Sequence, residues 1–84
     1  MFYTYILKSD KNNELYIGST NDLKRRLVEH NNGKVHSTKP YLPYKLVYYE
    51  AFGADSDARR RESMLKCRGQ ARRQLLVRLK DTLK

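Results

Sequence analysis

The segment Leu15-Tyr16-Ile17-Gly18 constrains the fold of this chain most, because it indicates a strand that ends directly before a helix. Its apolar and aromatic residues favour a short strand, and the glycine marks its end. Thr20-Asn21-Asp22 then provide the N-cap signal of a helix. That helix carries Arg26 and His30, which are four residues apart and therefore lie on one face. A strand-to-helix junction thus brings together a tyrosine, an arginine and a histidine.

Hydrophobic periodicity and turn residues predict the other elements. In chain order, we expect strands over Phe2–Lys8 and Glu14–Ser19, a helix that begins at Asn21-Asp22 and ends at Asn31-Asn32-Gly33, an exposed loop over 34–43, a strand over Tyr44–Phe52, a helix from a cap at Gly53–Asp57 to about Cys67, and a helix from about Gln70 to Leu83. The order β-β-α-β-α-α indicates one α+β domain over residues 1–84.

The register of the first two strands decides whether two tyrosines become neighbours. A loop over residues 9–12 would pair Lys8 with Asn13 and place Tyr5 opposite Tyr16. Residues that face each other in an antiparallel pair point to the same side of the sheet. We therefore expect the two phenols to lie side by side.

The charge of the chain indicates a polyanionic partner. Eighteen Lys and Arg residues against nine Asp and Glu give a formal net charge of +9, and two thirds of this excess falls in residues 54–84. Seven tyrosines add aromatic surfaces on which bases can stack. A solvated helical face explains the charge equally well, so composition suggests nucleic acid without naming an activity.

Several classes of protein are disfavoured by what the sequence lacks. A lone Cys67 cannot form an intramolecular disulfide, nor a zinc site with two widely separated histidines. The N-terminus does not resemble a signal peptide, and no apolar run approaches the roughly 18 residues of a membrane span. We therefore expect a soluble, cytoplasmic protein that does not use a membrane.

Glu62 is the most informative residue of the second helix. Ala58, Glu62 and Leu65 are spaced by four and three, which places the carboxylate on the apolar stripe that faces inward. Such a carboxylate is costly unless it is paired or bound to a metal. A salt bridge to a neighbouring arginine and a role as metal ligand both remain open at this point.

Taken together, these segments resemble the GIY-YIG nuclease family, specifically its small stand-alone members. The N-terminal nuclease domain of the bacterial repair protein UvrC is of the same kind. Tyr3-Thr4-Tyr5 stands where the family has GIY, and Tyr16-Ile17-Gly18 matches YIG in full. Asp22–Leu27 resembles the helix signature, and Arg60-Arg61-Glu62 resembles the segment with the metal-binding glutamate. The resemblance extends from Phe2 to about Leu79.

Three positions depart from the family pattern. Tyr3 replaces the glycine of the first half-motif, a change that looks common among small members. Ser19 stands where UvrC-like proteins carry a lysine, which removes a possible phosphate contact. His30 stands where others have a tyrosine, although histidine also occurs in the family. The chain carries no appended recognition domain, so sequence-specific cleavage is not expected.

The resemblance implies a three-stranded antiparallel sheet flanked by helices and a metal-dependent endonuclease. It implies that Glu62 binds Mg²⁺ (or Mn²⁺) and that Tyr16 is the general base or positions the water. Tyr5 is then its neighbour, and Arg26 is the phosphate clamp. His30 is either a hydrogen-bond partner of Tyr16 or the base itself.

The expected substrate is nucleic acid, in particular DNA, cut with low sequence specificity in repair or processing. The oligomeric state stays open, and a monomer is favoured. The side chains expected to contact it are Ser19, Lys24, Arg25, Lys34, Lys39, Arg60 and Arg72. Two alternatives remain: a degenerate domain that binds nucleic acid without cutting it, and a protein–protein module with an acidic partner.

Overall fold

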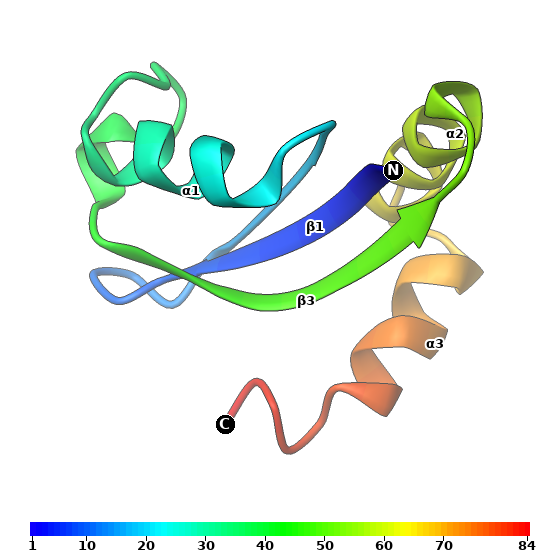
Figure 1. Ribbon diagram of the computed structural model, residues 1–84. Helices are drawn as coiled ribbons and strands as arrows, with labels where there is room; N and C mark the ends of the chain where they lie inside the picture. The colour runs from blue at the N-terminus through cyan, green and yellow to red at the C-terminus, as the bar shows by residue number, and fades with distance from the viewer.

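The fold was analysed in a computed structural model that describes all residues from 1 to 84 (Figure 1). Its elements, in chain order, are β1 (Phe2–Ser9), β2 (Leu15–Thr20), α1 (Leu23–Asn31), the 3₁₀ turn η1 (Lys39–Tyr41), β3 (Tyr44–Phe52), α2 (Asp55–Lys66) and α3 (Gln70–Arg78). The three strands form one antiparallel sheet in the order β2-β1-β3. The expected α+β class and the order of its elements are confirmed.

Both faces of the sheet are covered, with α1 on one side and α3 on the other (Figure 1). The core on one face is an apolar cluster, in which Ile6 and Ile17 pack against Leu65 of α2 and Leu75 of α3. The opposite face, beneath α1, is lined by aromatic and aliphatic side chains, which are Tyr5, Leu7 and Tyr44 with Tyr16, Leu23, Leu27, Leu42 and Leu46 around them. Because side chains alternate along a strand, β1 contributes to both cores.

The register of the hairpin differs from the prediction. Tyr5 lies opposite Gly18, and Leu7 lies opposite Tyr16. The strand β1 extends to Ser9, whose backbone N–H donates to the carbonyl of Glu14 at 2.9 Å, so the loop begins later than expected. The shift amounts to two residues, and because side chains alternate with period two, the two tyrosines remain on the same face.

Two predicted segments differ in their ends or their environment. The helix α3 ends at Arg78 instead of Leu83, and the following residues form turns that pack Leu83 against the apolar core. Lys8 fixes this end by donating to the Leu83 carbonyl at 2.9 Å. The segment 34–43 is not a wholly exposed loop, because Val35 and Thr38 are buried.

None of the helices combines the length and the apolar character required to cross a membrane.

Candidate active site

The junction between β2 and α1 is fixed by a capped helix start. Asp22 is the N-cap of α1, and its carboxylate accepts a hydrogen bond from the Arg25 backbone N–H at 3.0 Å. Leu23 and Leu27 then pack against the aromatic core on this face of the sheet. With the helix in this orientation, His30 lies completely buried beneath it.

His30 is held between two hydroxyl groups. Its Nε2 lies 2.9 Å from the Tyr5 phenol oxygen, and its Nδ1 lies 2.9 Å from Thr38 Oγ1. Burial, followed by the nearby charge of Arg26, lowers the pKa of His30 to about 4, so the imidazole is neutral near pH 7. The expected hydrogen bond to Tyr16 is wrong, because the partner on the sheet is Tyr5.

The contacts of Thr38 favour one direction for the hydrogen bonds around His30. Thr38 donates its hydroxyl proton to the Val35 carbonyl at 3.3 Å, so its oxygen accepts from the His30 Nδ1–H. The neutral ring then accepts at Nε2 from the Tyr5 hydroxyl. Tyr5 therefore directs its only hydroxyl proton into the core, and its oxygen can only accept from other groups.

Four of the predicted residues come together around the Tyr5 phenol. Burial raises the pKa of Tyr5 to about 12, and the neighbouring charges of Tyr16 and Glu62 act in the same direction. The guanidinium of Arg26, beside the phenol oxygen, acts against them. The structure thus groups two phenols and one guanidinium, which come from β1, β2 and α1, and the Glu62 carboxylate of α2 is near enough to act on the pKa of Tyr5.

Gly18 allows this close approach. A Cβ atom at this position would lie 2.5 Å from the Tyr5 hydroxyl oxygen and 3.1 Å from the Tyr16 ring. The phenol of Tyr5 therefore crosses directly over the backbone of β2 at the glycine. Tyr16 in turn packs its ring edge-to-face against His30, with centroids 4.9 Å apart. The glycine predicted to end the strand lies inside β2, which continues to Thr20, and it shapes the site.

Arg26 is half-buried, and its guanidinium lies between the phenols and an acidic side chain. Its Nη1 contacts Glu29 Oε1 at 3.2 Å. The Tyr5 phenol beside it and the Glu29 carboxylate both raise the pKa of Arg26. Arg25, one residue earlier, is exposed and donates to the Asn21 side chain at 2.9 Å. The two adjacent arginines therefore have different environments, and only Arg26 reaches the phenols.

Glu62 lies beside the edge strand β2, and both of its carboxylate oxygens have partners. Ser19 donates its hydroxyl to Oε1 at 2.8 Å, and the Lys66 ammonium contacts Oε2 at 2.7 Å. The salt bridge to an arginine that the sequence left open is wrong. Arg61, its neighbour in α2, instead binds both oxygens of Glu50 on β3.

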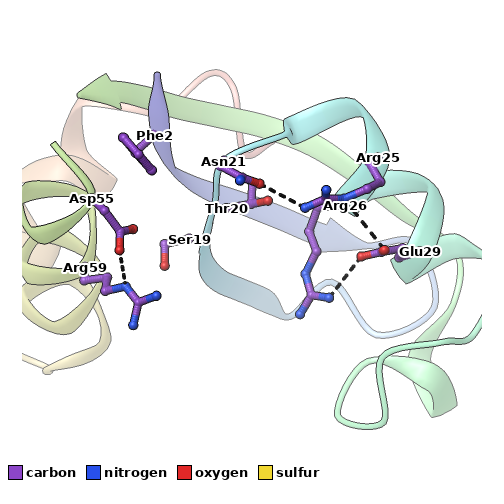
Figure 2. Close-up of a pocket in the computed structure, with 9 residues that line it drawn as sticks. All are labelled: Phe2, Ser19, Thr20, Asn21, Arg25, Arg26, Glu29, Asp55 and Arg59. Carbon is purple, nitrogen blue, oxygen red and sulfur yellow. Dashed lines mark hydrogen bonds and ion pairs between the residues drawn. The ribbon is translucent and has the colours of Figure 1, made fainter. Parts of the chain in front are cut away.

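A polar cleft of about 350 Å³ opens next to these residues, with α1 on one side and α2 on the other (Figure 2). Its lining residues are Phe2, Ser19, Thr20, Asn21, Arg25, Arg26, Glu29, Asp55 and Arg59. Arg59 and Asp55 form an ion pair at 2.9 Å on the α2 side. Three arginines and only one apolar side chain line the cleft, which suits a polyanion better than an apolar ligand.

The residues expected to bind nucleic acid are spread over the surface. Ser19 and Arg25 line the cleft. Lys24 and Lys34 flank a shallow depression on the outer side of α1, and Lys39 is exposed at the start of η1. Arg60 is exposed and paired with Asp57, and Arg72 donates to the Leu65 carbonyl at the end of α2.

Three residues of the site were not singled out from the sequence. Thr38 orients His30 from a segment predicted to be exposed, and nothing in the local sequence reveals this contact. Glu29 and Lys66 pair with Arg26 and Glu62 at helical spacings of three and four. That spacing is a visible signal, because side chains three or four apart on a helix are neighbours.

The family model described as the GIY-YIG catalytic domain matches residues 1–74. A UPF0213 protein of Streptococcus agalactiae serotype V is 45% identical over 65 residues, which are 76% of this chain and 73% of that protein. A UPF0213 protein of Clostridium perfringens is 45% identical over 67 residues, with 79% and 71% covered.

A solved structure agrees with these matches. The solution NMR structure of the UPF0213 protein BH0048 from Bacillus halodurans has a TM-score of 0.56 and 34% identity, over 95% of this chain and 86% of that one. Fold and site together define a small nuclease domain. The chain belongs to the GIY-YIG catalytic domain family, whose members are endonucleases, and its relatives are small UPF0213 proteins.

Proposed function

We propose that this protein is a metal-dependent endonuclease that hydrolyses phosphodiester bonds in DNA with low sequence specificity. The observation that carries the proposal is the convergence of Tyr5, Tyr16, Arg26 and Glu62 beside a polar cleft lined by arginines. Phosphodiester hydrolysis requires a positioned water and positive charge where the transition state gathers negative charge. The grouped side chains offer both.

Arg26 is the group that would bind the scissile phosphate. Its planar guanidinium can contact two phosphate oxygens at once, and it lies at the cleft next to both phenols. In the free protein, Glu29 occupies part of this donor set at 3.2 Å. A phosphate that enters the cleft would share or replace the Glu29 contact, because the guanidinium can bind two phosphate oxygens in parallel.

Tyr16 is the better candidate for the group that positions or deprotonates the attacking water. Tyr5 is buried with its proton directed to His30, and its pKa is raised to about 12, so it does not act as a base near neutral pH. His30 has both ring nitrogens engaged inside the core. Tyr16 is only partly buried, and its ring lies next to both of them.

Tyr5 and His30 then act as positioning residues. The chain of hydrogen bonds from Tyr5 through His30 to Thr38 fixes the direction of the phenol proton. The phenol oxygen is left with lone pairs that can accept from Arg26. The core of this face would therefore hold the guanidinium in place from below.

Glu62 would be the single protein ligand of a divalent metal. No cluster of three His, Cys, Asp or Glu side chains exists in the structure, so a site built from protein ligands alone is not available. One carboxylate with waters and phosphate oxygens nevertheless fits Mg²⁺, which is usually bound in this way. When bound, the metal supplies Lewis-acid stabilisation of the leaving oxygen.

A nuclease assay tests the proposal. We expect the purified protein to cut single-stranded, duplex or branched DNA in the presence of Mg²⁺ or Mn²⁺, and to lose cutting when EDTA is added. Tyr16→Phe removes the hydroxyl and keeps the ring, so it should abolish most of the cleavage without altering the melting temperature. Tyr41→Phe, at a tyrosine exposed on η1, is the matched control and should keep its activity.

The rival function is binding without cleavage. If none of the three DNA forms nor RNA is cut with either metal while the protein still binds them, the domain is a degenerate nucleic-acid binder. Binding itself should weaken with salt, with log K falling by about 0.7–0.9 per phosphate contacted for each tenfold rise in salt.

A further inference from the structure

Glu62 carries a counter-cation of its own in the free protein. Lys66 lies one helical turn further along α2, and its ammonium is 2.7 Å from Oε2 of the carboxylate. On the other side, the Ser19 hydroxyl donates to Oε1 at 2.8 Å and fixes how the carboxylate is turned. The ammonium therefore stands beside the oxygen that a metal would use.

A divalent cation at Oε2 would lie within a few ångströms of the Lys66 ammonium. At the rim of a protein, like charges at such a distance repel one another strongly. Lys66 must therefore leave before the metal can bind well. Its departure costs a modest amount of free energy, since 53% of the Lys66 and 21% of the Glu62 side chain are exposed and ion pairs near the surface are weak.

We propose that Lys66 is a resident competitor of the metal at Glu62, and that a substrate phosphate releases it. The inference rests on the proposed function, because it takes Glu62 as the metal ligand. The ammonium is a compact charge on a flexible stem, so it can turn from a carboxylate to a phosphate in the neighbouring cleft. Metal and nucleic acid should then bind cooperatively, each more tightly in the presence of the other.

Mn²⁺ binding in the absence of nucleic acid tests whether Lys66 competes with the metal. The concentration of the free ion is measured by electron paramagnetic resonance. Lys66→Met keeps a long side chain and removes the charge, so Mn²⁺ should bind at least about fivefold more tightly, as for a modest coupling between two sites. Lys66→Arg keeps the charge and should bind as weakly as the unmodified protein.

Lys45→Met is the matched control for net charge. Lys45 is exposed and lies away from Glu62. In the sheet Lys45 pairs with Lys8, whereas Ser19, the partner of Glu62, pairs with Thr4, four residues away along β1. Its loss should leave Mn²⁺ affinity nearly unchanged. Equal affinities of the Lys66→Met and Lys45→Met variants would overturn the competition.

The release of Lys66 by a substrate phosphate is tested with a single-stranded oligonucleotide and Mn²⁺. The Tyr16→Phe background is used so that the strand stays intact. The oligonucleotide should tighten Mn²⁺ binding more in the protein that retains Lys66 than in the Lys66→Met protein. An equal effect in both would show that the phosphate does not release Lys66.

Glu62→Gln separates this inference from the proposed function. If Mn²⁺ binding depends on Glu62 but not on Lys66, the competitor is refuted and the metal ligand stands. If Glu62→Gln binds Mn²⁺ as well as the unmodified protein does, Glu62 is not the ligand, and the inference fails together with the metal-binding part of the proposed function.

Discussion

The two faces of the sheet are built differently, although the same central strand supplies both. On the α2/α3 face, the core residues Ile6, Ile17 and Leu65 are purely apolar. On the α1 face, the core contains Tyr5 and His30, joined by a hydrogen bond at 2.9 Å. The core of one face therefore packs by apolar contact, while the core of the other also buries the polar groups that position Arg26. The Glu62 carboxylate comes from α2, at the rim of the first face.

The difference shows on which face the fold buries polar groups that are costly to desolvate. A buried histidine loses solvation, and its place in the core is acceptable only because both nitrogens have partners. No buried side-chain nitrogen or oxygen in this structure lacks a partner. The α1 face is therefore a fully satisfied polar core, which orients the phenol of Tyr5 toward Arg26.

Within the comparison of the two faces, a large effect on activity is expected at Arg26, at the edge of the α1 face. Arg26→Ala removes the guanidinium proposed to bind the phosphate, and the cleavage rate should fall by about 10²–10³-fold, as for the loss of one transition-state donor. Arg73→Ala, at an exposed arginine of α3, is the control and should cut nearly normally. Equal losses in both variants would mean that general charge, and not this position, supports cleavage.

The apolar face should respond in stability and not in chemistry. Leu65 is 1% exposed, so Leu65→Ala should lower the free energy of unfolding by about 2–5 kcal/mol in urea denaturation. Cleavage measured well below the melting temperature should be retained. Val77→Ala, at a side chain that is 75% exposed, should change stability by less than about 0.5 kcal/mol. A Leu65→Ala protein that stays folded but does not cut would remove the distinction between the faces.

The polar face should make stability depend on pH through His30. Its pKa is about 4 in the folded protein against 6.5 in an unfolded chain, so the unfolded state takes up the proton first. The free energy of unfolding should therefore fall as the pH drops from about 6.5 to about 4, by about 3 kcal/mol in total.

His30→Gln should remove this part of the pH dependence in denaturation curves at several pH values. His36→Gln, at the exposed histidine of the 34–43 segment, should retain it. A slope that is the same in both variants would contradict the assignment of a neutral, buried imidazole.

A smaller effect is expected from the Tyr5 hydroxyl alone. Tyr5→Phe keeps the ring over Gly18 and leaves Nε2 of His30 without its donor, so stability should fall by about 1–3 kcal/mol. Tyr49→Phe, at a side chain that is 52% exposed on the same face, should cost less than about 0.5 kcal/mol. Similar melting temperatures for the two variants would show that the buried hydrogen bond contributes little.

Most of the fold could be predicted because each element has a local signal. The Asp22 cap, the alternation of β1 and the apolar run of β3 each follow from neighbouring residues. The end of α3 could not be predicted, because it depends on the contact of Lys8 with Leu83, which are far apart in the chain. The hairpin register was missed by two residues, since the sequence does not say which residue closes the loop.

The site was less predictable than the fold. The neighbourhood of Tyr5 and Tyr16 survived the register error because a shift by two keeps both on one face. The partner of His30 depends on Thr38, which comes from a segment with no regular pattern. Lys66 could have been found from its spacing to Glu62, but its role depends on the distance between the two side chains.

The most direct test of the central claim is the metal-dependent cleavage rate of the Glu62→Gln protein. Glutamine keeps the shape and can still accept from Ser19. The lost pair with Lys66 lies at the surface, with 53% of the Lys66 and 21% of the Glu62 side chain exposed, so it contributes about 1 kcal/mol. The account predicts a protein that melts at nearly the same temperature and does not cut DNA with Mg²⁺ or Mn²⁺. A Glu62→Gln protein that cuts at the unmodified rate would contradict the assignment of Glu62 to the active site.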